Sequence, residues 1–148
     1  MSFSKTFCSS PWLHMRVNND GSFDYCRWSQ PDQSVISFVP KITDTSLTDY
    51  FTNSLAEIRL SLLEGKKLNG CRSCYKMEEF SKVSGRQKQL LKSGIMQDHF
   101  EKSLAASSLN KNFLYSYQHQ GITNRFPADL QIDLGNYCNS SCIFCSPE

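Results

Sequence analysis

The stretch that says most about the fold is residues 129–145, which read DLQIDLGNYCNSSCIFC. Its first six residues alternate between polar and apolar side chains, which is the pattern of a half-buried strand. A short turn follows at residues 135–137. Three cysteines then come at C-x3-C-x2-C spacing, namely Cys138, Cys142 and Cys145. The sequence therefore predicts a strand that leads directly into a loop carrying three thiols.

The spacing of these thiols suits an iron–sulfur cluster, because thiolates three and four residues apart on a loop can converge on one face of a cuboidal cluster. Three protein ligands leave one of the four irons open, and a small molecule can chelate that iron. A closed zinc site takes four ligands, so zinc at this loop needs a fourth ligand from elsewhere in the chain. Chance spacing and zinc both remain alternatives for the three-cysteine loop.

A strand, a short turn and then CNSSCIFC resembles the start of the radical S-adenosylmethionine superfamily, whose signature is C-x3-C-x-aromatic-C. The resemblance implies that Cys138, Cys142 and Cys145 hold a [4Fe–4S] cluster whose open iron binds S-adenosylmethionine. It further implies reductive cleavage of S-adenosylmethionine to a 5′-deoxyadenosyl radical that abstracts hydrogen from a peptide or small-molecule substrate. Phe144 occupies the aromatic position, which in the family packs near the adenine of this cofactor. Members of the family take electrons from a donor such as flavodoxin or ferredoxin.

The other four cysteines are Cys8, Cys26, Cys71 and Cys74, which is the right number for one closed metal site. The C-x2-C spacing of Cys71 and Cys74 occurs in zinc sites and in iron–sulfur sites alike. The residues alone therefore leave the metal at this four-cysteine set open between zinc and iron.

The pattern C-x12-G-x4-C from Cys8 through Gly21 to Cys26, followed by C-x2-C, resembles the SPASM/Twitch auxiliary-cluster region of radical S-adenosylmethionine enzymes. The resemblance implies one auxiliary [4Fe–4S] cluster, the Twitch case, because no cysteine lies between Cys74 and Cys138 to bind a second. The order differs from the usual one, since here the region precedes the three-cysteine loop. The alternative is a four-thiolate zinc site in a non-catalytic structural or interaction module.

The rest of the chain predicts a mixture of strands and helices. Alternation over residues 13–17 and 23–26, with a turn between them, indicates a β-hairpin. Residues 54–57 have the pattern of a capping box, which begins a helix that runs to Gly65. A second helix is expected over residues 75–92, weakened in the middle by a Ser-Gly pair. Alternating aromatic residues over 113–117 are typical of a strand.

These elements define an α+β fold class with three parts. Residues 1–95 form a Twitch-like region of a hairpin plus helices, residues 96–127 connect, and residues 128–148 begin a radical S-adenosylmethionine core. That core consists here of the first strand and the cluster loop of an incomplete (β/α) barrel, since a complete barrel needs about 250 residues. We therefore expect the 148-residue chain to be inactive on its own.

Composition excludes several partner classes. The chain has 16 Lys+Arg against 14 Asp+Glu, and a net charge of +2 gives no electrostatic case for nucleic acid or an anionic membrane. There is no run of about 18 apolar residues, as a membrane span requires, and no apolar run of a secretory signal. Seven cysteines without an export signal indicate metal ligands in the reducing cytoplasm, where disulfides are rare.

Two other groups of residues carry no functional prediction. His14, His99 and His119 are scattered, and none lies at metal-ligand spacing from a cysteine pair, so we interpret them as ordinary histidines. The basic cluster is interpreted as the solvated face of a helix. It consists of Lys82, Arg86, Lys88 and Lys92.

Overall fold

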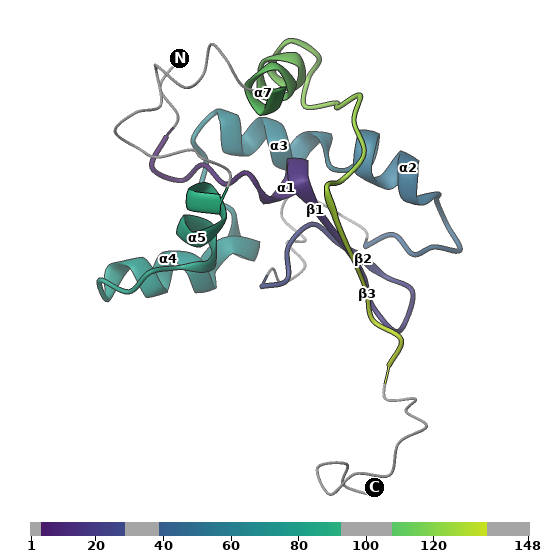
Figure 1. Ribbon diagram of the computed structural model, residues 1–148, viewed down its shortest axis with the longest axis horizontal. Coiled ribbons are helices and arrows are strands. Elements are labelled where there is room, and N and C mark those ends of the chain that lie inside the picture. The colour runs from purple at the N-terminus through teal and green to yellow at the C-terminus, as the bar shows by residue number, and fades with distance from the viewer. Residues whose placement is uncertain (1–3, 29–38, 93–107, 136–148) are drawn as a thin grey trace, which may run out of the picture.

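The computed structural model describes residues 4–28, 39–92 and 108–135, which form a three-stranded sheet with helices around it (Figure 1). The fold is therefore mixed α+β, as predicted. The strands are β1 (His14–Val17), β2 (Phe23–Asp24) and β3 (Asp129–Ile132). The helical elements in chain order are α1 (Ser10–Leu13), α2 (Leu47–Asp49), the π-helix η1 (Tyr50–Ser54), α3 (Ala56–Leu63), the 3-10 helix η2 (Asn69–Cys71), α4 (Arg72–Glu79), α5 (Gly85–Lys92) and α7 (Ser108–Gln118).

The sheet has the strand order β2-β1-β3. β1 and β2 pair antiparallel, with Val17 opposite Phe23, and Gly21 has a φ of +80° in the turn between them. The predicted hairpin is confirmed, although its return strand is only two residues long. The predicted strand before the cysteine loop is confirmed as β3, which pairs parallel to β1 with His14 opposite Asp129. The parallel pairing joins the two ends of the described chain in one sheet.

Helix α3 does not begin with the predicted capping box. Its N-cap is Leu55, and no side chain caps the helix, because η1 runs continuously into it. Gly65, with a φ of +82°, follows the end of α3 as predicted. The single helix expected over residues 75–92 is two helices, α4 and α5. The break between them includes Ser81, whose φ of 55° cannot be part of a right-handed helix.

The strand predicted over residues 113–117 is wrong, because this segment lies inside helix α7. Phe113 and Ser116 are buried and lie three residues apart, on one helical face. Tyr117, the next residue, is exposed. The Trp12 Nε1 atom donates a hydrogen bond to Ser116 Oγ at 2.9 Å in the buried interior. This bond fixes α7 against α1 from more than one hundred residues away.

The core lies between the sheet and the helices α3 and α7. Phe7, Trp12 and Phe113 form an aromatic cluster with ring centroids 5.0 to 5.5 Å apart. Phe113 meets both other rings edge to face, and such contacts contribute about 0.5–1.5 kcal/mol each beyond the area that they bury. The fully buried aliphatic side chains come from α3 and the residue before it, namely Leu55, Ile58 and Leu62. This core supports the short segment that leads from Phe7 into β1.

Arg59 on α3 is fully buried and donates to four backbone carbonyls. Its guanidinium donates to the carbonyls of Pro11, Thr52 and Gly121 at 3.0–3.3 Å, and to that of Phe51. The carbonyls of Phe51 and Thr52 belong to the π-helix η1, so the buried guanidinium ties this irregular turn to α1 and to the segment after α7. Burial lowers the pKa of Arg59 to about 9, so the side chain is charged at neutral pH.

Strand β3 is an outer strand of the sheet. Leu130 and Ile132 on it are 45% and 55% exposed, and within the described ranges no strand pairs with its outer edge. These ranges hold no complete barrel. No helix in them is both long and apolar enough to cross a membrane.

Candidate metal centre

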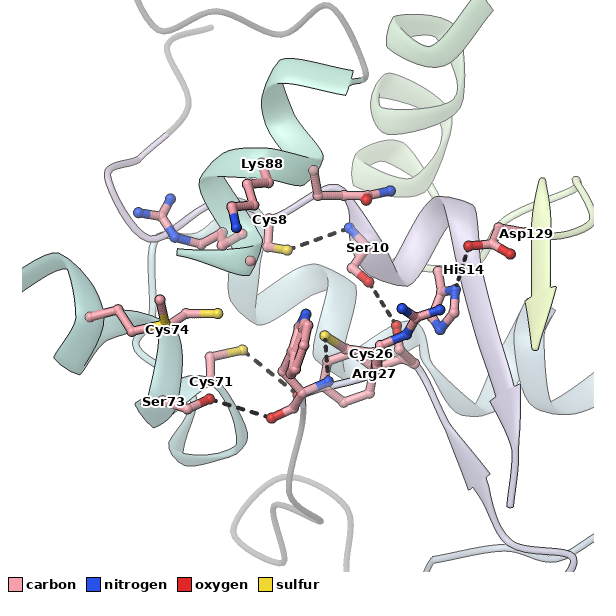
Figure 2. A pocket seen from close by; sticks show the side chains of 16 residues that line it. Cys8, Ser10, His14, Cys26, Arg27, Cys71, Ser73, Cys74, Lys88 and Asp129 are labelled. Atoms are coloured by element: carbon pink, nitrogen blue, oxygen red, sulfur yellow. Dashed lines mark hydrogen bonds and ion pairs between the residues drawn. The ribbon is translucent and has the colours of Figure 1, made fainter. Parts of the chain in front are cut away.

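The four cysteines predicted to share one site line a single cavity of about 410 Å³. Figure 2 shows their sulfur atoms around the same space, although the four residues come from three separate chain segments. The other lining residues are mostly polar or basic. They are Ser10, His14, Tyr25, Arg27, Trp28, Ser73, Met77, Gly85, Arg86, Lys88, Gln89 and Asp129. The structure thus brings together Cys8, Cys26, Cys71 and Cys74.

Each cysteine lies at the end of a secondary-structure element. Cys8 precedes α1, and Cys26 follows β2. Cys71 ends η2 and is the N-cap residue of α4, which places Cys74 in the first turn of that helix. The free N–H groups and the dipole at a helix N-terminus favour negative charge, so this position suits two thiolates. All four cysteines are free thiols.

Three of the four sulfurs take part in hydrogen bonds, and two of them accept from backbone N–H groups. The Ser10 N–H donates to Cys8 Sγ at 3.5 Å, and the Trp28 N–H donates to Cys26 Sγ at 3.4 Å. In each case the donor lies two residues after the cysteine. The Tyr25 hydroxyl lies 3.8 Å from Cys71 Sγ. Donors aimed at sulfur stabilise thiolates, so the cavity is arranged for cysteines that have lost their protons.

Without a cation, however, the thiols are costly to ionise. Burial raises the pKa of the Cys8 thiol, the Ser10 hydrogen bond opposes this, and the charges of the neighbouring cysteines add to it. Burial also raises the pKa of Cys71 to about 11, although the Tyr25 hydrogen bond lowers it. A bound metal removes this penalty, because the cation offsets the charge of the thiolates. The site therefore needs a cation to carry four negative charges.

Among the described residues, no three His, Cys, Asp or Glu side chains lie close enough together to hold a single metal ion. A zinc ion binds sulfur at about 2.3 Å, which holds four tetrahedral sulfurs within about 4 Å of one another. The four sulfurs here surround a space instead of meeting at a point (Figure 2).

Basic side chains form part of the cavity wall. Arg86 is buried, pairs with Glu78, and donates to the Phe7 carbonyl at 2.9 Å. Lys88, two residues further along α5, is exposed and also lines the cavity (Figure 2). Two members of the basic cluster that the sequence assigned to solvent thus line the cavity.

His14 is a further residue that the sequence did not single out for function. It is 5% exposed, and its Nδ1 lies 2.9 Å from Asp129 Oδ2 on β3. Its Nε2 is buried and has no hydrogen-bond partner within the described part of the chain. The cross-strand position opposite Asp129 could not be anticipated, because the parallel pairing of β1 and β3 is not visible in the spacing of the residues.

The three-cysteine loop lies outside the described residues. Cys138, Cys142, Phe144 and Cys145 all fall in the range 136–148, so no contact of theirs is available. The structure does describe strand β3, which precedes the loop. Asp129 at the start of β3 lines the four-cysteine cavity, and the strand leads from there toward Gly135.

Comparison with known proteins gives no relative. No protein-family model matches the chain, and neither a curated protein nor a solved structure is significantly similar to it. The class of protein must therefore be argued from the residues and from the cavity.

Proposed function

We propose that this chain is the N-terminal part of a radical S-adenosylmethionine enzyme and that its four-cysteine cavity is the auxiliary-cluster site of a Twitch-like region. The observation that carries the proposal is the cavity itself. Cys8, Cys26, Cys71 and Cys74 line it together, with hydrogen-bond donors at three of the four sulfurs. Four thiols that converge without forming disulfides are the donor set of a metal site.

The arrangement of the sulfurs favours an iron–sulfur cluster over zinc as the occupant. In a [4Fe–4S] cluster each cysteine binds a different iron, so the sulfurs surround a group of several atoms. A cavity of about 410 Å³ with four thiols on its wall fits such a group.

The surroundings of the cavity fit a negatively charged cluster. Lys88 and the N-terminus of α4 contribute positive potential, and the Tyr25 hydroxyl adds a hydrogen bond. Positive charge and hydrogen bonds to sulfur raise the reduction potential of an iron–sulfur cluster. An auxiliary role in electron transfer or in structural support follows, because four cysteines leave no iron open for a substrate.

The catalytic part of the proposal rests on the motif at the end of the chain. Cys138, Cys142 and Cys145 would hold the second [4Fe–4S] cluster, and Phe144 would pack near the adenine. A cluster bound by these three cysteines, with S-adenosylmethionine on its open iron, would supply the electron for reductive cleavage of the sulfonium. A peptide or another small molecule would be the substrate, a flavodoxin or ferredoxin the electron donor, and the cytoplasm the reducing compartment.

The proposal is tested by anaerobic reconstitution of the chain, followed by electron paramagnetic resonance of the reduced protein with and without S-adenosylmethionine. We expect two cluster signals, of which only one changes when S-adenosylmethionine is added. Cys142→Ala should remove the signal that responds, and Cys71→Ala should remove the other. If neither signal responds to S-adenosylmethionine, or if one substitution abolishes both clusters, the division of ligands between two sites is wrong.

A further inference from the structure

Positive charge is concentrated in the segment that contains helices α4 and α5. Residues 66–92 hold eight basic and two acidic side chains, whereas the whole chain carries a net charge of only +2. One of the two acidic residues, Glu78, is paired with the buried Arg86 and so is not available to neutralise the surface. The remaining residues of the chain are therefore acidic on balance, and the protein has a strongly uneven charge distribution.

The cations on this segment are exposed. Arg72, Lys76, Lys82 and Lys88 all lie on the surface, and none of them forms an ion pair with another described residue. A surface cation that already forms an intramolecular ion pair contributes little to the attraction of a partner protein. These four remain available to attract an anionic one, because their field is not cancelled locally.

Large apolar side chains are exposed between the cations. Phe80 is 75% exposed, Val83 is 53% exposed, and Met77 is 39% exposed. Exposed aromatic and methionine side chains with a charged rim are typical of protein–protein interfaces, where the apolar centre supplies affinity.

The same helices form the wall of the four-cysteine cavity. Met77 on α4 and Lys88 on α5 both line the cavity, and Trp28, which also lines it, is 59% exposed beside Gly85. Figure 1 shows α4 and α5 together at one side of the molecule, away from the strands. The basic and apolar surface and the lining of the four-cysteine cavity therefore belong to the same two helices.

We propose that this α4–α5 surface docks a small acidic electron-transfer protein that reduces the cluster in the four-cysteine cavity. The surface is defined by Arg72, Lys76, Met77, Phe80, Lys82 and Val83. The inference rests on the proposed cluster at the four cysteines. In the step itself the donor's reduced cofactor loses one electron and the cluster gains it, from the 2+ to the 1+ state. No bond forms or breaks and no proton moves.

The test uses the Cys142→Ala, Cys145→Ala chain, in which only the four-cysteine set is complete, and a photoreduced flavodoxin as the acidic donor. Stopped-flow absorbance measures the second-order rate of cluster reduction as a function of salt. Lys76→Gln, Lys82→Gln should lower this rate on the order of tenfold at low ionic strength and flatten its salt dependence. The matched control is Lys111→Gln, Arg125→Gln, which removes two exposed cations elsewhere and should leave the rate within twofold.

A separate measurement distinguishes the docking surface from the cluster. Dithionite should reduce the cluster to the same extent, at the same midpoint potential, in both double variants and in their parent. Equal rates in the two double variants would overturn the docking surface while leaving the cluster intact. The parent could instead bind anionic vesicles or single-stranded DNA more tightly than it binds the flavodoxin. If the Lys76 and Lys82 substitutions abolish that binding, the surface belongs to that partner and the proposed docking is wrong. Failure to form any cluster would overturn the proposed function, and this inference with it.

Discussion

The Tyr25 hydroxyl lies 3.8 Å from the sulfur of Cys71, in the wall of the four-cysteine cavity. Burial, and then the negative charge of Cys71, raise the pKa of Tyr25, so the phenol keeps its proton and acts as the donor. Hydrogen bonds to the cysteine sulfurs are among the factors that set the reduction potential of a cluster. We therefore propose that Tyr25 tunes the cluster proposed for this cavity.

Tyr25→Phe keeps the buried ring and removes only the hydroxyl. We expect the midpoint potential of the four-cysteine cluster to fall by up to about 60 mV, which is tenfold in a one-electron equilibrium. The reason is that the reduced cluster carries more negative charge and loses more from the missing bond. Spectroelectrochemical titration measures the shift. Tyr117→Phe on the exposed face of α7 is the control, and an unchanged or raised potential in Tyr25→Phe contradicts the assigned role.

Gly121→Ala is predicted to destabilise the fold strongly. The φ of Gly121 is +85°, and an added Cβ would lie 1.9 Å from the carbonyl oxygen of Ala56, a backbone atom that cannot move alone. The Gly121 carbonyl also accepts a bond from Arg59 at 3.3 Å. We expect a loss of about 2–4 kcal/mol in the free energy of unfolding, measured by urea denaturation.

Gly65→Ala is the matched control for Gly121→Ala. Gly65 has a similar φ of +82°, but its added Cβ would meet Ser4 Cβ at 2.9 Å, a much milder approach than the 1.9 Å at Gly121. The difference between the two variants isolates the backbone clash from the cost of the left-handed conformation. Equal losses in both would show that the packing of Gly121 against α3 is looser than described.

Much of the fold could be predicted from local pattern. Strand β3 and the hairpin follow from strict alternation, and the end of α3 follows from Gly65. Helix α7 was missed because Phe113, Tyr115 and Tyr117 alternate as in a strand. The burial of Phe113 and Ser116 is decided instead by tertiary contacts with Trp12, which lies about one hundred residues earlier. The π-helix η1 was missed for a similar reason, since Arg59 stabilises it from another turn.

The metal-free chain is predicted to lose stability at high pH. Burial raises the pKa of Cys71 from 9.0 to about 11 in the folded chain, and raises that of Cys8 as well. The folded state therefore binds more protons than the unfolded state above pH 9, and its stability must fall as the pH rises through that range. Below about pH 8 both states hold these protons and the contribution is fully present.

Urea midpoints of the metal-free chain between pH 7 and pH 11 check this expectation. The decline attributable to Cys71 alone should amount to about 2 kcal/mol by pH 11, and Cys8 should add a decline of similar size. Cys8→Ala, Cys71→Ala is the control and should show a shallower decline, because other groups such as the tyrosines remain. A parallel decline in parent and variant contradicts the burial of these thiols in the metal-free fold.

The candidate site was predictable in part. The four cysteines could be grouped from their number and spacing, and they do line one cavity. Tyr25, His14 and Lys88 could not be assigned to it, because no sequence spacing shows that a residue of β1 or α5 faces thiols from three other segments. The three-cysteine loop remains a prediction from its motif, since Cys138, Cys142 and Cys145 lie outside the described residues.

The most direct test of the central claim is the metal content of the Cys142→Ala, Cys145→Ala chain after anaerobic reconstitution with iron, sulfide and zinc supplied together. Only Cys8, Cys26, Cys71 and Cys74 can then form a complete thiolate set. The account predicts about four irons and four sulfides per chain, with zinc well below stoichiometric. One zinc per chain with no bound iron would contradict the account and assign the cavity to a structural zinc site.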